Sequence, residues 1–141
     1  GNGGSHERIP RGVMKIFGIG IDVIEVERIE EAMEEFGDRF LERIFTTEER
    51  DYCLKQKRPA IHFAARWAAK EAVSKAFGTG IGELLAWQDM EIARLHSGEP
   101  KMILHGRGRE FVEERGITQV KISLTHARNY AAANAVAMGE R

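Results

Sequence analysis

The sequence has one cysteine, no long apolar run and almost no net charge, and each of these deficits excludes a class of protein. Cys53 has no partner for an internal disulfide, so we expect a reducing, cytoplasmic location. No apolar run is long enough for a signal peptide or a membrane helix. The 21 Lys and Arg against 22 Asp and Glu give a formal net charge of -1, which creates no overall field toward nucleic acid or an anionic membrane. We therefore expect no nucleic-acid partner and no membrane partner, and an acidic partner would have to meet a local basic patch.

What remains is the composition of a globular protein, with 43% apolar and 30% charged residues among 141. We predict one domain over residues 14–141. Residues 1–13 are Gly-rich, lack periodicity and precede Met14, so we interpret them as an expression-tag remnant. A domain of this size buries roughly two-thirds of its unfolded surface and leaves little interior for a deep pocket, which favours an active site shared between subunits.

Apolar periodicity predicts that helices dominate the first half of the chain and strands the second. In the first half we predict a strand at residues 15–23 and helices at residues 26–40, 46–54 and 60–77. Gly37 is the expected break in the first helix, Thr46 and Glu49 form a capping box, and Gly78 stops the last helix. In the second half we predict strands at residues 87–95, 101–105, 120–125 and 130–138, and a helix at residues 109–115. The expected fold is α+β, with the helices packed on an antiparallel meander.

The strand at residues 130–138 has two apolar faces, and one of them contains alanine alone. Such a pattern suits burial on both sides. The alanine face permits close approach by another sheet or subunit, or by the chain's own helices, and the pattern leaves both alternatives open.

Asp22 is the first acid that can carry chemistry, because it lies at the end of an otherwise apolar strand. It shares its face with Gly18 and Gly20, whose missing side chains leave space for a ligand. A carboxylate in that position can hold a hard cation. Asp is also a leading N-cap residue, and on spacing alone we favour a cap for the helix that follows.

Glu71 and Lys75 lie one turn apart on the alanine-rich helix, beside Trp67 and among small side chains. Glu four residues before Lys is the favourable order for an ordinary surface ion pair. The same two residues can also act on a phosphate ester, with the carboxylate binding Mg²⁺ and the ammonium stabilising phosphate oxygens. The spacing alone leaves both interpretations open.

Two short segments are weak candidates for phosphate binding. The turn Gly78-Thr79-Gly80 can bring backbone N–H groups to a phosphate, but it lacks a full nucleotide-binding motif and is better explained as a helix stop. His126 follows Thr125 in the connection between two strands, where it is either a turn residue or a phosphate contact.

A basic cluster is expected near the start of the alanine-rich helix. Lys57, Arg58 and Arg66 either bind phosphate there or form a solvated surface, which is the commoner role of such a cluster. His62 and His105 lack the companion residues of a zinc site, so we interpret both as structural. We interpret Cys53 as an incidental thiol, because no histidine motif accompanies it.

Three segments together resemble the holo-acyl-carrier-protein synthases of the 4′-phosphopantetheinyl transferase superfamily. They are GIGIDVIEVERI at residues 18–29, FAARWAAKEAVSKAFGTGIG at residues 63–82 and SLTHARNYAAA at residues 123–133. The segments occur in the order typical of that family, and the similarity extends over about residues 14–138.

The resemblance implies the fold of that family, a homotrimer with active sites at the subunit interfaces, and roles for particular residues. Asp22 and Glu71 match the magnesium ligands, and Lys75 matches the phosphate-binding lysine. A larger set matches contacts to coenzyme A, chiefly to its pyrophosphate and 3′-phosphate: Lys57, Arg58, Arg66, Gly78, Thr79, Gly80, Thr125 and His126.

Arg28 matches the contact to the acidic recognition helix of the acyl carrier protein, with Arg39 and Arg43 as further candidates. Family members often have a basic docking helix, whereas this chain has several acids in the same segment: Glu30, Glu31, Glu34, Glu35 and Asp38. This difference from the family affects how tightly the chain binds a carrier protein and which carrier protein it selects.

The activity implied is the Mg²⁺-dependent transfer of 4′-phosphopantetheine from coenzyme A to a serine of apo acyl carrier protein. The reaction releases adenosine 3′,5′-bisphosphate and supports fatty acid biosynthesis in the cytoplasm. The alternatives are a non-catalytic nucleotide-binding protein and a structural oligomer of the same fold. The presence of Asp22, Glu71 and Lys75 argues against both.

Overall fold

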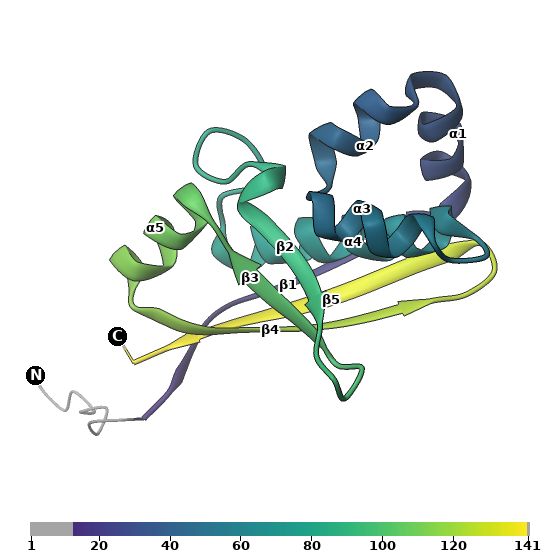
Figure 1. Cartoon of the computed structure of the whole chain (residues 1–141). Coiled ribbons are helices and arrows are strands. Elements are labelled where there is room, and N and C mark those ends of the chain that lie inside the picture. Colours follow the sequence, from purple (N-terminus) through teal and green to yellow (C-terminus); the bar gives the residue numbers. More distant parts are fainter. Residues whose placement is uncertain (1–12, 141) are drawn as a thin grey trace, which may run out of the picture.

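A computed structural model describes residues 13–140 of the chain (Figure 1). The predicted tag remnant therefore lies outside the described residues, except for Val13. The elements in chain order are β1 (Lys15–Glu25), α1 (Val26–Phe36), α2 (Asp38–Ile44), α3 (Thr47–Leu54), α4 (Pro59–Phe77), a 3-10 turn η1 (Trp87–Asp89), β2 (Met90–Arg94), β3 (Pro100–Leu104), α5 (Gly106–Arg115), β4 (Ile117–His126) and β5 (Tyr130–Gly139). The predicted α+β class and the predicted breaks at Gly37 and Gly78 are confirmed. Within residues 13–140, no helix combines the length and the apolar character needed to span a bilayer.

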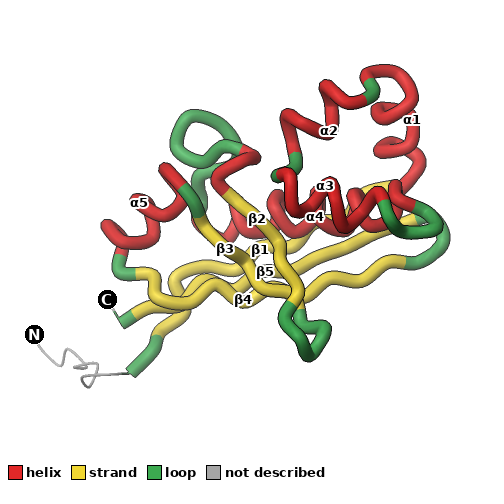
Figure 2. The backbone as a smooth tube through the Cα atoms, viewed as in Figure 1, coloured by secondary structure: helices red, strands yellow, loops and turns green. Residues whose placement is uncertain are grey.

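Within residues 13–140, the strands form two separate antiparallel sheets (Figure 2). β5 lies in the centre of a sheet between β1 and β4, and β2 pairs with β3 alone. The expectation of one meander in the second half is therefore wrong. β1 joins β5, from Lys15 opposite Gly139 to Glu25 opposite Tyr130, and so pairs the first strand with the last. Alternating side chains identify a strand and its faces, but they do not identify the strand with which it pairs.

α4 packs on one face of the larger sheet, and two glycines of β1 permit its close approach. A Cβ on Gly20 would lie 1.8 Å from the carbonyl oxygen of Ala72, and a Cβ on Gly18 would lie 1.9 Å from that of Ala76. The expectation that these glycines leave space for a ligand is wrong, because the backbone of α4 fills that space. The glycines instead fix how deeply α4 sits on β1.

The all-alanine face of β5 is buried against the chain's own helix α4. Ala131, Ala133, Ala135 and Ala137 are at most 4% exposed. Of the two alternatives left open by the sequence, cover by the chain's own helix is therefore the one found for this face.

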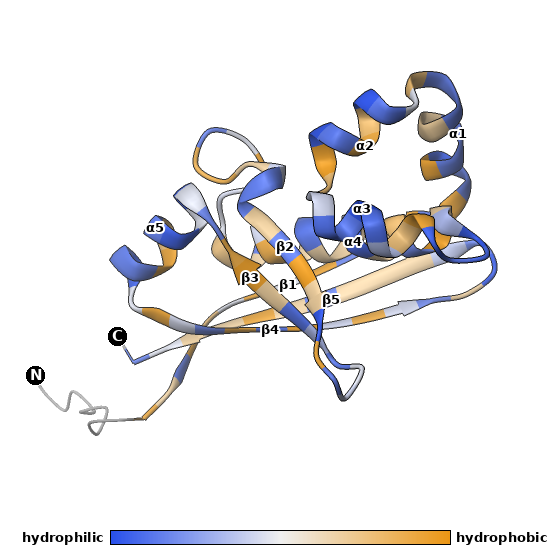
Figure 3. Cartoon of the chain, viewed as in Figure 1, coloured by the Kyte–Doolittle hydropathy of each residue, from blue (hydrophilic) through white to orange (hydrophobic). Residues whose placement is uncertain are grey.

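The opposite face of the sheet is uncovered in the single chain. Ile19, Ile21 and Val23 of β1 are 65%, 70% and 63% exposed, and Ile19 lies opposite Val136 of β5. Apolar colouring runs along both strands in Figure 3. Exposed apolar side chains in contiguous rows are typical of an interaction surface.

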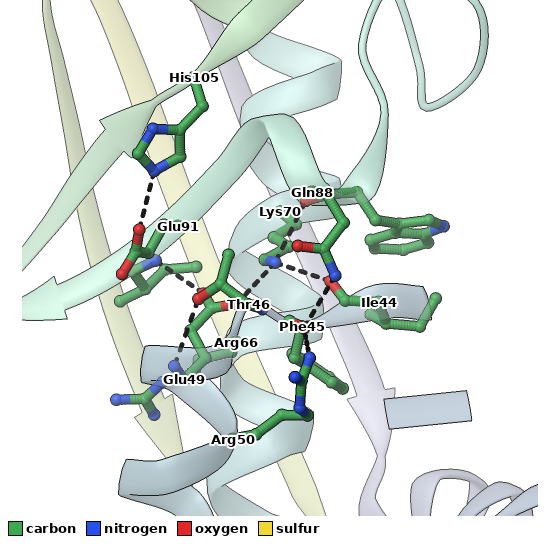
Figure 4. Close-up of polar contacts among 12 residues, drawn as sticks. Ile44, Phe45, Thr46, Glu49, Arg50, Arg66, Lys70, Gln88, Glu91 and His105 are labelled. Carbon is green, nitrogen blue, oxygen red and sulfur yellow. Dashed lines mark hydrogen bonds and ion pairs between the residues drawn. The ribbon is translucent and has the colours of Figure 1, made fainter. Parts of the chain in front are cut away.

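A buried ion pair connects the helices to the β2–β3 hairpin (Figure 4). The side chains of Glu49 and Lys70 are both 0% exposed, and Lys70 Nζ lies 2.8 Å from Glu49 Oε1. Lys70 Nζ also donates to the Ile44 carbonyl at 2.8 Å, and Glu49 Oε2 accepts from the Ile92 N–H at 2.7 Å. Glu49 is also half of the predicted capping box with Thr46, which is confirmed. One carboxylate thus caps α3 and joins it to α4 and β2.

Candidate active site

Asp22, Glu71 and Lys75 meet where β1 passes beside α4. Lys75 Nζ lies 3.1 Å from Asp22 Oδ1 and donates to the Ile21 carbonyl at 3.0 Å. Asp22 and Glu71 both line a cavity of about 340 Å³. Residues 53 positions apart in the sequence therefore form one polar cluster.

Asp22 does not cap the helix that follows it. The N-cap residue of α1 is Glu25, and no side chain bonds to that helix end. Asp22 lies inside β1, opposite Ala133. The cap interpretation favoured on spacing is therefore wrong, since the strand continues beyond the predicted end at Val23.

The surroundings of Glu71 disfavour the ionised form of its carboxyl group. Burial raises the pKa of Glu71, the negative charge of Asp22 raises it further, and Lys75 opposes both effects. A bound cation would relieve this repulsion. Two carboxylates offer the hard oxygen ligands that Mg²⁺ prefers. Residues 13–140 contain no group of three or more potential metal ligands among histidine, cysteine and acidic side chains.

Aromatic side chains form a wall beside the acids. Phe40 and Trp67 line the cavity that holds Asp22 and Glu71, and Trp67 also packs on Trp87 with ring centroids 4.4 Å apart. Sequence analysis assigned no functional role to these aromatic residues. The available signal was the position of Trp67, one helical turn before Glu71.

Arg28 lines the same cavity as the two acids, and a second cavity lies beyond the aromatic wall. The second cavity has a volume of about 510 Å³, and exposed Arg39 and Arg43 contribute to its lining. Phe40 and Trp67 are shared by both cavities. The three arginines predicted to contact a carrier protein therefore lie around neighbouring hollows.

The turn after α4 acts as a helix stop. Gly78 has a left-handed backbone, and its N–H donates to the Lys75 carbonyl at 3.0 Å. The N–H groups of Thr79 and Gly80 both donate to the Ser74 carbonyl at 3.2 Å. These amides are therefore engaged within the turn, and their predicted contact with coenzyme A stays a prediction.

The residues of the predicted basic cluster have different surroundings. Arg58 donates to the Arg128 carbonyl at 2.6 Å and lies 3.4 Å from Glu30. Arg66 is only 2% exposed, and its guanidinium lies 4.6 Å from the centre of the Tyr52 ring. Lys57 is exposed in the connection between α3 and α4.

His126 and Thr125 end β4, where both are exposed. The His126 ring lies 5.5 Å from the ring of His62, which comes from α4. His62 and Glu71 are nine residues apart, so they project from α4 in directions about 180° apart. His126 therefore lies by a different side of α4 from the two acids.

Two remaining residues have the passive surroundings that were expected. Cys53 is fully buried, and burial raises the pKa of its thiol to about 12, which leaves it without a reactive thiolate. His105 Nε2 lies 2.8 Å from Glu91 Oε1.

The chain was compared with known proteins. The model of the 4′-phosphopantetheinyl transferase superfamily matches residues 18–135. A holo-[acyl-carrier-protein] synthase of Chlamydia trachomatis serovar D is 45% identical over 122 residues, which cover 86% of this chain and 99% of the relative.

Two solved structures have similar folds. The holo-[acyl-carrier-protein] synthase of Neisseria meningitidis has a TM-score of 0.83 and 33% identity, over 90% of this chain and 100% of that chain. The synthase of Helicobacter pylori, solved in complex with coenzyme A, has a TM-score of 0.76 and 31% identity, over 84% of this chain and 98% of that chain.

Proposed function

Because the chain belongs to the 4′-phosphopantetheinyl transferase superfamily, we infer that it is a holo-[acyl-carrier-protein] synthase. It transfers 4′-phosphopantetheine from coenzyme A to a serine of apo acyl carrier protein and releases adenosine 3′,5′-bisphosphate. The observation that carries this conclusion is that Asp22 and Glu71 line one cavity, while Lys75 forms an ion pair with Asp22. We further propose that the reaction occurs in the cytoplasm and supplies fatty acid biosynthesis.

In the reaction, the serine oxygen forms a bond to the β-phosphorus of coenzyme A. The bond from that phosphorus to the oxygen shared with the α-phosphate breaks, and the electron pair leaves with adenosine 3′,5′-bisphosphate. Lys75 places a positive charge beside Asp22, where it can stabilise phosphate oxygens. Either Glu71 or a water at the cation site would accept the serine proton as general base, because either could lie near that proton.

Asp22 and Glu71 are the residues that would hold Mg²⁺. When bound, the ion supplies neutralisation of the charge on the pyrophosphate. The mutual repulsion of the two carboxylates and their hard oxygens support this assignment.

We propose a homotrimer whose active sites combine residues of two subunits. The uncovered apolar face of β1 and β5 supports an interface there. α4 projects Glu71 and His62 in directions about 180° apart. One ligand can therefore contact the Glu71 side of α4 and the His62 side more easily when the two sides come from different chains. One subunit would supply Asp22, Glu71 and Lys75, and its neighbour would supply Thr125 and His126.

Complementation tests this arrangement. Inactive Glu71→Ala and inactive His126→Ala chains, mixed and reassembled, should regenerate some intact sites and partly restore activity. A monomer by light scattering at the assay concentration, or no activity from variants shown to co-assemble, would contradict a shared site.

For the coenzyme A contacts, we propose Lys57, Arg58 and the Gly78–Gly80 turn in addition to the residues of β4. Arg58 would have to leave Glu30, an exchange that is easy for an ion pair whose side chains are 42% and 45% exposed. Buried Arg66 would attract the phosphates of coenzyme A through its positive charge, without direct contact.

Carrier docking is proposed at Arg28, Arg39 and Arg43. These exposed arginines border the aromatic wall of Phe40 and Trp67, so an acidic helix could place apolar side chains in the hollow and its carboxylates on the rim. The acids of α1 lie nearby and would weaken this attraction, which favours a carrier with fewer negative charges facing that helix.

Mass spectrometry of the carrier tests the activity directly. Apo acyl carrier protein incubated with the chain, coenzyme A and Mg²⁺ should gain the mass of phosphopantetheine, and Lys75→Ala should slow the gain. An unmodified carrier would contradict the proposed reaction and favour a binding protein of the same fold.

A further inference from the structure

The last turn of α2 is held by the side chain of Gln88, which belongs to η1 (Figure 4). Its amide nitrogen Nε2 donates to the Glu42 carbonyl at 2.7 Å and to the Phe45 carbonyl at 2.8 Å. The Phe45 carbonyl also accepts from Arg50 of α3. The last carbonyl groups of a helix have no partner within the helix, and a side-chain amide has two N–H donors. Both donors of Gln88 are therefore used on the end of α2.

Lys70 of α4 also donates to this end of α2, at the Ile44 carbonyl, but it has a second role. Its ammonium belongs to the buried ion pair with Glu49, so its loss would disturb the core as well as α2. Gln88 is exposed. Replacement of Gln88 therefore removes contacts to α2 without opening a cavity in the core.

α2 depends on such contacts for its orientation. It has seven residues, which are too few for a stable helix in isolation, and no side chain caps its first turn after Gly37. It carries Arg39 and Arg43, which line the second cavity together with Trp67 and Trp87. The end of α2 that Gln88 holds therefore helps to set where the two arginines lie relative to the tryptophans.

We propose that Gln88 is a positioning residue for the carrier protein. It fixes the end of α2 and so keeps Arg39 and Arg43 at the rim of the second cavity, where an acidic carrier helix can contact both. This inference rests on the proposed function, in particular on carrier docking at these arginines. Gln88 would act through the arginines and not by its own contact with the carrier, since its two donors are already used.

The position of Gln88 predicts an effect on the carrier alone. Among the described residues, its side-chain amide bonds to no residue of β1 or α4, the elements that carry Asp22, Glu71 and Lys75. Loss of Gln88 should therefore weaken carrier binding and leave coenzyme A binding and the chemical step unchanged.

Isothermal titration of the full chain with apo acyl carrier protein measures docking, and carrier loading followed by mass spectrometry gives kcat and the KM for coenzyme A. Gln88→Met keeps a long side chain and the same charge but cannot donate. Gln56→Met is the matched control, because Gln56 Nε2 donates at 3.0 Å to the Tyr52 carbonyl near the end of α3, and neither residue lines the second cavity.

We expect Gln88→Met to weaken carrier binding about fivefold, the factor that corresponds to the net contribution of one typical hydrogen bond. The kcat at saturating carrier and the KM for coenzyme A should not change, and Gln56→Met should leave carrier binding at its original strength. In a chain that already has Arg39→Ala and Arg43→Ala, Gln88→Met should cause no further weakening, because its effect passes through these arginines.

Unchanged carrier binding in Gln88→Met would overturn the proposal. So would an equal loss in the chain without the two arginines, or a matching change in the KM for coenzyme A, because either would indicate a general structural effect. An unmodified chain that binds the carrier without loading it would contradict the proposed reaction alone, since the Gln88 comparison needs only binding. An unmodified chain that does not bind the carrier would overturn this inference together with the proposed docking site.

Discussion

Replacement of Gly20 by alanine should damage both stability and transfer activity, although Gly20 touches no substrate. The new Cβ would lie 1.8 Å from the Ala72 carbonyl oxygen and 2.8 Å from the amide nitrogen of Ala76. Backbone atoms cannot rotate away, so α4 and β1 must separate by about 1.5 Å to restore a normal contact. Overpacking of this kind costs about 1–3 kcal/mol, and the strain here falls at the severe end of that range.

The same displacement should lower turnover, because it moves the functional groups apart. Ala72 adjoins Glu71 on α4, and Asp22 is two residues beyond Gly20 on β1. A misplacement of about 1 Å can cost on the order of 100-fold in rate. We therefore expect a loss of that size in kcat/KM, together with a lower midpoint of urea unfolding.

Gly82→Ala is the matched control, since a Cβ at Gly82 has no atom within 4 Å and its backbone is not left-handed. Urea unfolding followed by circular dichroism measures stability, and carrier loading followed by mass spectrometry measures activity, both at one protein concentration. A Gly20→Ala chain with the stability and turnover of Gly82→Ala would refute the role given to the close contact between α4 and β1.

Four further predictions test other parts of the molecule. Asp22→Ala and Glu71→Ala should each reduce carrier loading about 100-fold or more at limiting Mg²⁺ while leaving the circular dichroism spectrum unchanged, and near-normal turnover in either would remove the metal assignment. Since burial and the charge of Asp22 raise the pKa of Glu71 in the metal-free chain, Mg²⁺ should bind more weakly as pH falls and should release protons when it binds, and calorimetry in two buffers should find less proton release in Glu71→Gln. Arg28→Glu should raise the apparent KM for carrier protein about tenfold, with a smaller effect at high salt and no change in coenzyme A affinity; the opposite division would place Arg28 in the coenzyme A site. Lys70→Met should lower the free energy of unfolding by about 3–5 kcal/mol, because it leaves Glu49 charged and buried. The added substitution Glu49→Gln should recover part of this loss. A loss below about 1 kcal/mol would contradict a stabilising role for the buried ion pair.

Features set by neighbouring residues were predictable from the sequence. The capping box of Thr46 and Glu49 depends on two residues three positions apart, and the end of α4 depends on the conformational freedom of Gly78. The meeting of Asp22, Glu71 and Lys75 was anticipated through the family resemblance. Spacing alone could not provide it, because β1 and α4 are far apart in the chain.

Features set by tertiary partners were not predictable from local pattern. The glycines of β1 have the same appearance in sequence whether a ligand or a helix occupies the space above them, and only the position of Ala72 decides. Arg66 has a charged side chain that is normally exposed, yet Tyr52 covers it. His62 belongs to no sequence motif, and its contact with His126 at the end of β4 is set by the tertiary fold.

Because the two sides of α4 would belong to two different active sites, a defect in one chain would affect the activity of mixed trimers. In the proposed trimer, one α4 gives Glu71 to one active site and the His62 side to the adjacent one. A chain with a displaced α4 would thus impair a neighbour's site in addition to its own. In a cell that produces normal and Gly20→Ala chains together, mixed assemblies would therefore lose a larger fraction of their activity than the fraction of defective chains.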